Sequence, residues 1–201
     1  MVKHRYSRDR KKAHQHDSSN GKSAAANRAR LIMQGREAYQ AGDLTSARKI
    51  FLKVISKDAG NAEALYSLSC IAHDRKLYAD AIEYLGKLRE LHPDHRPGLF
   101  LLGSAYISTK SYGEAAEIYQ VTVKMNPNDA EGWYNLGFVA GAQNNLDEAV
   151  AYYEKALSLN DRYTDASYNI GCIRLTQHRY EEAEQWFQKT IDLAASYAAA
   201  W

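Results

Sequence analysis

The sequence contains only two cysteines, Cys70 and Cys172, among its 201 residues. This small number excludes a disulfide-stabilised scaffold and a zinc site built from several cysteines. The sequence also has no apolar run near the length of about 18 residues that a membrane-spanning helix needs, so no membrane span is predicted. Only three residues are proline and 45% of the residues are hydrophobic, which is typical of a chain that folds over most of its length.

Net charge is also small, at +2 for the whole chain, but it is unevenly distributed. Residues 1–30 contain nine lysines and arginines against two aspartates, whereas residues 31–201 carry a net charge of −5. Residues 1–27 have almost no apolar side chains that could offset the entropy lost on ordering. We therefore predict a disordered basic tail over residues 1–27, followed by a mildly acidic folded part.

Three roles are compatible with the basic tail: a solubilising segment, a contact with phosphates or an acidic membrane surface, and a nuclear localisation signal. No base-reading motif accompanies the tail, so nucleic acid is not the expected partner. The tail also lacks the apolar segment of a secretory signal peptide. We therefore expect a cytoplasmic protein, with the nucleus as the alternative that the basic tail offers.

From Arg28 onward, the sequence repeats with a period of 34 residues. Three sets of positions share this register: a small-residue ladder (Gly35, Ser69, Gly103, Gly137, Gly171), an alanine ladder (Ala47, Ala81, Ala115, Ala149, Ala183) and an apolar ladder (Leu44, Tyr78, Tyr112, Leu146, Tyr180). The agreement of three ladders predicts five repeats, over residues 28–61, 62–95, 96–129, 130–163 and 164–197. Residues 198–201 would then begin a sixth repeat.

Each repeat is predicted to contain two helices. In residues 130–163, apolar residues at helical spacing are followed by a break at Asn144 and Asn145 and then by a second helical stretch. Small residues on both stretches indicate a close helix crossing, at which we place Gly137 and Ala149.

This pattern resembles the tetratricopeptide repeat, a 34-residue helix–turn–helix whose signature is matched best by AEGWYNLGFVAGAQNNLDEAVAYYEKALSLN. The resemblance covers residues 28–197. It implies an all-α, right-handed solenoid of five repeats, in which the first helix of each repeat lines an inner groove. Family members serve mainly as binding scaffolds, so the resemblance also implies a protein or peptide partner.

Mapped onto this chain, the resemblance gives a peptide-binding groove with four aromatic residues at 34-residue spacing. We call these residues the aromatic row: Tyr66, Phe100, Tyr134 and Tyr168. The candidate groove residues are Tyr66, Phe100, Tyr134, Asn135, Phe138, Tyr168 and Asn169, and Glu131 and Asp165 are placed on the same inner surface. An Asn amide can donate to and accept from the backbone of an extended peptide, and Tyr adds contact area with little rotamer entropy to lose. The alternative is that some of these tyrosines only pack against the neighbouring repeat.

Two narrower functions of the family were compared with these positions. Cochaperones hold a chaperone's C-terminal carboxylate with inward Lys and Arg. The corresponding positions in the first three repeats are Ile32, Arg36, Ser67, Pro97 and Leu101. Only one of these is basic, so this ligand is not expected. The asparagine-lined repeats of O-linked N-acetylglucosamine transferases are matched by Asn135 and Asn169 but not in the first three repeats.

The leading hypothesis is a non-catalytic scaffold or adaptor that binds a partner peptide in the groove. No Ser-His-Asp or Cys-His arrangement is evident, so we expect no catalytic site, cofactor or bound metal. The alternative is the N-terminal substrate-recruiting arm of a larger enzyme such as an O-linked glycosyltransferase, and a weaker one is a nucleic-acid-associated adaptor acting through the tail. An uncapped fifth repeat would expose core side chains. We therefore expect either a longer protein or cover by a partner or by self-association.

Overall fold

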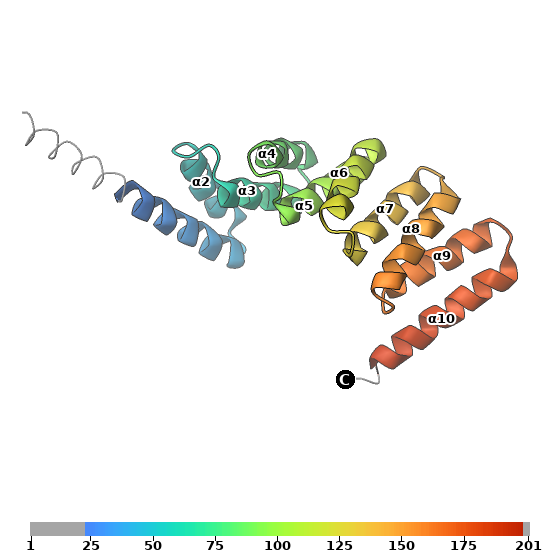
Figure 1. Ribbon diagram of the computed structural model, residues 1–201. Helices are drawn as coiled ribbons and strands as arrows, with labels where there is room; N and C mark the ends of the chain where they lie inside the picture. Colours follow the sequence, from blue (N-terminus) through green and yellow to red (C-terminus); the bar gives the residue numbers. More distant parts are fainter. Residues whose placement is uncertain (1–22, 199–201) are drawn as a thin grey trace, which may run out of the picture. The chain divides into compact units, whose positions relative to one another are not determined.

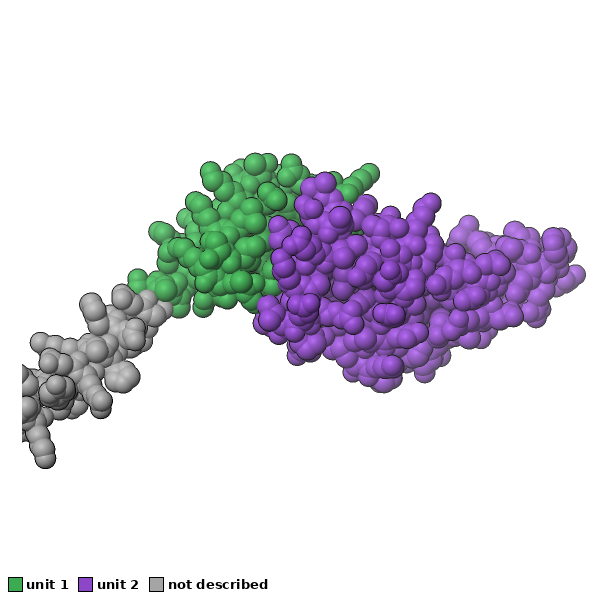
Figure 2. All heavy atoms as spheres, turned by 90° about the horizontal axis from the view of Figure 1, so that it is seen from above, with its two compact units in different colours: residues 1–76 green, residues 77–201 purple. Residues whose placement is uncertain are grey.

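The computed structural model of the protein describes residues 23–198, and all regular secondary structure in this range is α-helical. The prediction of an all-α fold is confirmed, and the helices recur at the predicted spacing of 34 residues (Figure 1). The tail as far as residue 22 and residues 199–201 of the predicted sixth repeat lie outside the described residues. The chain divides into two compact units, unit 1 at residues 1–76 and unit 2 at residues 77–201 (Figure 2).

Unit 1 contains a helix over residues 23–40, followed by α2 (Leu44–Ile55) and α3 (Ala62–Asp74). The first helix includes residues 23–27, which the sequence pattern predicts to be part of the tail. Three of these residues are alanines, and alanine has the highest helix propensity. The unit's largest buried apolar side chains are those of Phe51, Val54, Leu65, Leu68 and Ile71.

Unit 2 is built from helix hairpins that follow one another along the chain. Its helices are α4 (Tyr78–Leu91), α5 (Arg96–Ser108), α6 (Tyr112–Met125), α7 (Ala130–Ala142), α8 (Leu146–Leu159), α9 (Thr164–Thr176) and α10 (Tyr180–Ala198). Helices α5 and α6, α7 and α8, and α9 and α10 pair as the hairpins of three repeats. Contacts of α6 with α7 and of α8 with α9 stack these hairpins. No helix in the described range is long and apolar enough to cross a membrane.

The second helices differ in length according to their stop signals. Helices α6 and α8 have 14 residues each and are followed by Asn126 and Asn160, which take an extended backbone conformation. Helix α10 has 19 residues, because alanines occupy the corresponding stretch and favour continuation of the helix.

The turn inside every repeat contains one residue in the left-handed region. These residues are Gly42 (φ 79°), Lys76 (59°), Lys110 (61°), Asn144 (63°) and His178 (58°). After α5, the N–H of Ser111 donates to the carbonyl oxygen of Tyr106 at 2.8 Å, which is the long hydrogen bond of a Schellman motif. The same bond closes the turns at residues 38–43, 140–145 and 174–179. Four repeats therefore hold a side chain in a conformation that favours glycine.

The glycines of the small-residue ladder lie against aromatic rings of the second helix. A Cβ added to Gly137 would lie 2.7 Å from Cδ1 of Tyr153, which is closer than two carbons can approach. The equivalent pairs are Gly35 with Phe51, Gly103 with Tyr119, and Gly171 with Phe187. Ala149 instead faces Gly141, where an added Cβ would lie 3.8 Å away. Gly137 and Ala149, which the sequence predicts to lie at one crossing, thus make separate contacts in one hairpin.

Candidate peptide-binding site

Three members of the aromatic row pack on a ring of the second helix in their own repeat. Phe100 meets Tyr119 edge-on, with ring centroids 5.8 Å apart, and the corresponding distance between Tyr134 and Tyr153 is 5.5 Å. Tyr168 lies 5.7 Å from the ring of Phe187. The second-helix rings are the same ones that cover the ladder glycines. Each of these three row residues therefore packs on a second-helix ring, and that ring fits there because the ladder glycine three residues later in the first helix has no side chain.

Tyr134 is held on more than one side. Its ring stacks on that of Tyr163, with centroids 4.9 Å apart and planes 28° apart. The amide nitrogen Nδ2 of Asn169 donates to the phenol oxygens of Tyr134 at 3.4 Å and of Tyr153 at 3.3 Å. Burial raises the pKa of the Tyr134 phenol, and the carboxylate of Asp165 raises it further. Tyr134 and Asn169 are thus part of the packing between α7 and α9, as the alternative interpretation of the row proposed.

Asn135, Phe138 and Tyr168 remain accessible on the same two helices. Phe138 is 42% exposed and Tyr168 is 53% exposed. The half-buried side chain of Asn135 makes no hydrogen bond to any of the described residues. Helical spacing places Asn135 and Phe138 along one side of α7, and the bond between Asn169 and Tyr134 brings the matching side of α9 next to it. We call these three residues, with Glu131 and Asp165, the α7–α9 surface.

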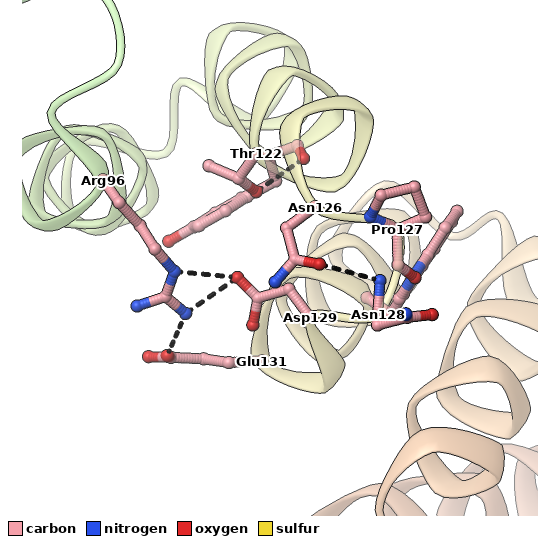
Figure 3. Close-up of polar contacts among 9 residues, drawn as sticks. Arg96, Thr122, Asn126, Pro127, Asn128, Asp129 and Glu131 are labelled. Carbon is pink, nitrogen blue, oxygen red and sulfur yellow. Dashed lines mark hydrogen bonds and ion pairs between the residues drawn. The ribbon is translucent and has the colours of Figure 1, made fainter.

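Arg96, the first residue of α5, contacts both an aromatic-row residue and the carboxylates near the start of α7. The guanidinium of Arg96 lies 4.2 Å from the centroid of the Phe100 ring. Its Nη2 lies 2.7 Å from a carboxylate oxygen of Asp129, and its Nε donates to the same oxygen at 2.9 Å (Figure 3). Nη2 also donates to Glu131 at 3.1 Å. Phe100 is therefore covered by Arg96, and Asp129, which is only 8% exposed, is neutralised.

Burial raises the pKa of Tyr163, and carboxylates from two successive repeats raise it further through their negative charge. Burial is the main cause that raises the pKa of this phenol to about 12, followed by the negative charges of Glu131 and then Asp165. Arg96 neutralises Glu131, whereas no ion pair to Asp165 forms within residues 23–198. The α7–α9 surface therefore combines exposed rings, an available amide and a free negative charge.

The remaining row residue, Tyr66, belongs to unit 1, where it borders a separate cavity of about 130 Å³. The cavity is lined by Arg36, Tyr39, Gln40, Phe51, Tyr66, Ser67 and Cys70. Burial, followed by the neighbouring Cys70, raises the pKa of Tyr66 to about 12. At the side of this cavity, the phenol of Tyr39 donates to Asp74 at 2.6 Å. Both cysteines of the chain are free thiols.

Five of the seven candidate residues are thus brought together on α7 and α9, namely Tyr134, Asn135, Phe138, Tyr168 and Asn169. Phe100 is covered by Arg96, and Tyr66 lies in unit 1. Sequence reasoning missed Arg96 and Tyr163 as neighbours of the row. The sequence contained a signal for Arg96. Asp129 and Glu131 follow it by 33 and 35 residues, which is about one repeat, so an ion pair between neighbouring repeats could have been predicted.

Comparison with known families agrees with the repeat pattern. Models of the tetratricopeptide repeat match residues 32–95, 72–136 and 128–196. A stretch of 74 residues is 34% identical to protein O-mannosyl-transferase Tmtc3 of Drosophila melanogaster. That match spans 37% of this chain but only 8% of the length of the transferase.

Solved structures give the same fold. A crystal structure of MamA is 28% identical, with a TM-score of 0.78, and the match covers 82% of this chain and 96% of that one. Another MamA structure is 27% identical, with a TM-score of 0.79 and coverage of 86% and 94%. YrrB, described as a TPR protein with an unusual peptide-binding site, is 21% identical with a TM-score of 0.71 over 81% of this chain and 84% of its own. At that identity, the likeness to YrrB concerns the fold alone.

Proposed function

Because the chain belongs to the tetratricopeptide repeat family, we propose that it is a non-catalytic scaffold that binds an extended peptide of a partner protein on the α7–α9 surface. The single observation that carries this proposal is the availability of Asn135, Phe138 and Tyr168. The Asn135 amide, which makes no hydrogen bond to any residue from 23 to 198, stands on the same side of α7 as the exposed ring of Phe138, and Tyr168 adds a second exposed ring on α9. Amide and ring together can hold a peptide backbone and an apolar side chain.

The similarity to YrrB supports the proposal only through the shared fold. The description of YrrB as a peptide-binding protein makes a peptide the natural class of ligand to test first. The packing of Tyr134 and Asn169 also bears on the proposal, because it fixes the α7 and α9 backbones that present the accessible groups. A preorganised surface binds with a smaller loss of conformational entropy.

The test begins with peptides selected from a random displayed library on the full chain. We expect Asn135→Ala with Phe138→Ala to weaken binding of a selected peptide by about 1–3 kcal/mol, as is typical of central interface contacts. Both side chains are partly exposed, so the helical circular dichroism signal should not change. Fluorescence anisotropy of the labelled peptide measures the affinity.

A matched control removes similar groups from another part of unit 2. Tyr180→Ala with Gln185→Ala deletes an exposed ring and an exposed amide of α10 and should leave the affinity unchanged. If the library yields no binder, or if the two double variants bind alike, the proposed site is wrong.

A second candidate function is the recruitment of substrate to a larger enzyme, and the similarity to Tmtc3 favours it. The repeats would then deliver a protein substrate to a transferase domain. An immunoblot of the native polypeptide tests this candidate. A band much heavier than 22.7 kDa would support it, and a band near that mass would reject it.

A further inference from the structure

Unit 2 is acidic, and the described helices of its binding surface carry no available cation. Residues 77–201 contain ten lysines and arginines against seventeen aspartates and glutamates, a net charge of −7. Helix α7 has no basic residue, and α9 has only Arg174. The Arg174 side chain is 13% exposed and is turned to α10, with its Nε 3.3 Å from a carboxylate oxygen of Glu182.

The same unit shows how this fold holds an arginine. Arg96 lies over the ring of Phe100. It also pairs with Glu131, which comes from the first helix of the next repeat (Figure 3). The ring face attracts the guanidinium through its quadrupole, and the carboxylate supplies the opposite charge. A ring on one first helix and a carboxylate on the next therefore form a cation-binding arrangement.

One repeat later, the carboxylate recurs without a cation, and the corresponding ring is stacked on Tyr163 instead of lying under a guanidinium. Tyr134 corresponds to Phe100, and Asp165 corresponds to Glu131. Ala130 stands in the place of Arg96, and Tyr163 replaces Asp129. The Asp165 carboxylate is exposed and forms no ion pair with the described residues. One helical turn further along α9 stands the exposed ring of Tyr168.

We infer that the α7–α9 surface selects a basic peptide, in which an arginine or lysine pairs with Asp165 while its alkyl stem or a second cation rests on the exposed rings of Tyr168 and Phe138. This inference rests on the proposed function and adds the charge class of the ligand. Charge complementarity argues for it, because the Asp165 carboxylate lies in an acidic unit and forms no ion pair within the part of the chain that the structure describes, and α7 contains no basic residue. The exposed rings add contacts that both alkyl stems and cations favour.

The test uses three labelled peptides that share one sequence and differ only at four positions, which hold Arg, Gln or Glu. With the full chain, we expect the Arg peptide to bind about tenfold tighter than the Gln peptide, and the Glu peptide to bind most weakly. Raising the salt concentration from about 0.05 M to about 0.5 M should reduce the preference for Arg, because salt screens exposed charges.

Asp165→Asn removes the negative charge while keeping the size of the side chain. We expect it to weaken binding of the Arg peptide about two- to fivefold, which is the range for one exposed ion pair, and to leave the Gln peptide unaffected. Asp161→Asn is the matched control, since Asp161 is an exposed aspartate in the turn just before α9. This control should bind all three peptides like the unaltered chain.

The outcomes separate the inference from the proposed function. If the Glu peptide binds as well as the Arg peptide, or if Asp165→Asn and Asp161→Asn behave alike, the charge selectivity is wrong. Library-selected peptides that still depend on Asn135 and Phe138 would then leave the proposed function standing. If neither the library nor the three peptides bind, both the function and the inference fail.

Discussion

Replacing Gly137 by alanine should destabilise unit 2, although alanine is the better helix former. The added methyl group would lie 2.7, 2.8 and 3.0 Å from three ring carbons of Tyr153. Tyr153 is itself only 3% exposed and accepts a hydrogen bond from Asn169, so its ring has little room to move away. The substitution thus inserts a carbon into a filled contact.

The size of the destabilisation can be isolated by comparing Gly137→Ala with the same substitution at a second glycine. Gly86 lies within α4, and an added Cβ there meets nothing within 4 Å. Gly86→Ala should stabilise the protein by about 0.5–1 kcal/mol, because alanine loses less backbone entropy in a helix. Gly137→Ala gains a similar amount but loses about 1–3 kcal/mol to overpacking. The difference between the two variants therefore isolates the cost of the contact, at about 1–3 kcal/mol.

Urea denaturation followed by far-ultraviolet circular dichroism measures both variants. Equal free energies of unfolding for Gly137→Ala and Gly86→Ala would refute the close-approach argument. A rescue variant adds specificity: Tyr153→Leu should recover part of the loss in the Gly137→Ala background. The sequence offers a precedent, since the ladder position held by Ser69 is followed sixteen residues later by Leu85 instead of an aromatic residue.

Two other predictions concern backbone conformation and pH. Lys110→Gly should raise the free energy of unfolding by about 0.5–1 kcal/mol. Lys110 has φ 61°, and a residue with a side chain costs about 1–2 kcal/mol in this left-handed conformation. Glycine removes that cost, but its larger loss of backbone entropy on folding offsets part of the gain. Urea titration should show the opposite sign for Gly42→Ala, and a stabilised Gly42→Ala would contradict the assigned turn conformation. Because the pKa of Tyr163 is raised to about 12, above the ordinary value of about 10 for a tyrosine phenol, the folded state keeps this proton to higher pH than the unfolded state. Stability should therefore fall as pH rises from about 10 to 12, and Tyr163→Phe should make this fall shallower in urea titrations at successive pH values.

The fold could be predicted from the sequence because its information is local and repeated. The 34-residue ladders set the spacing of the helices, and the Asn144–Asn145 break lies in the turn where Asn144 takes a left-handed backbone conformation. For the candidate site, the sequence predicted which repeat positions face the groove, but not which of those side chains are accessible. Asn135 and Phe138 remain accessible, whereas Tyr134, one residue before Asn135, is packed between Tyr163 and Tyr153.

The all-α repeat architecture follows from the sequence alone, since helix period, turn residues and small-residue spacing are properties of short segments. Which groove residues are available depends on the tertiary structure. Arg96 covers Phe100 and neutralises Glu131, while the same position one repeat later holds Ala130 and leaves Asp165 without a cation among the described residues. Equivalent positions in a repeat thus acquire different roles, because their accessibility and charge depend on side chains about 34 residues away that meet only when neighbouring repeats stack.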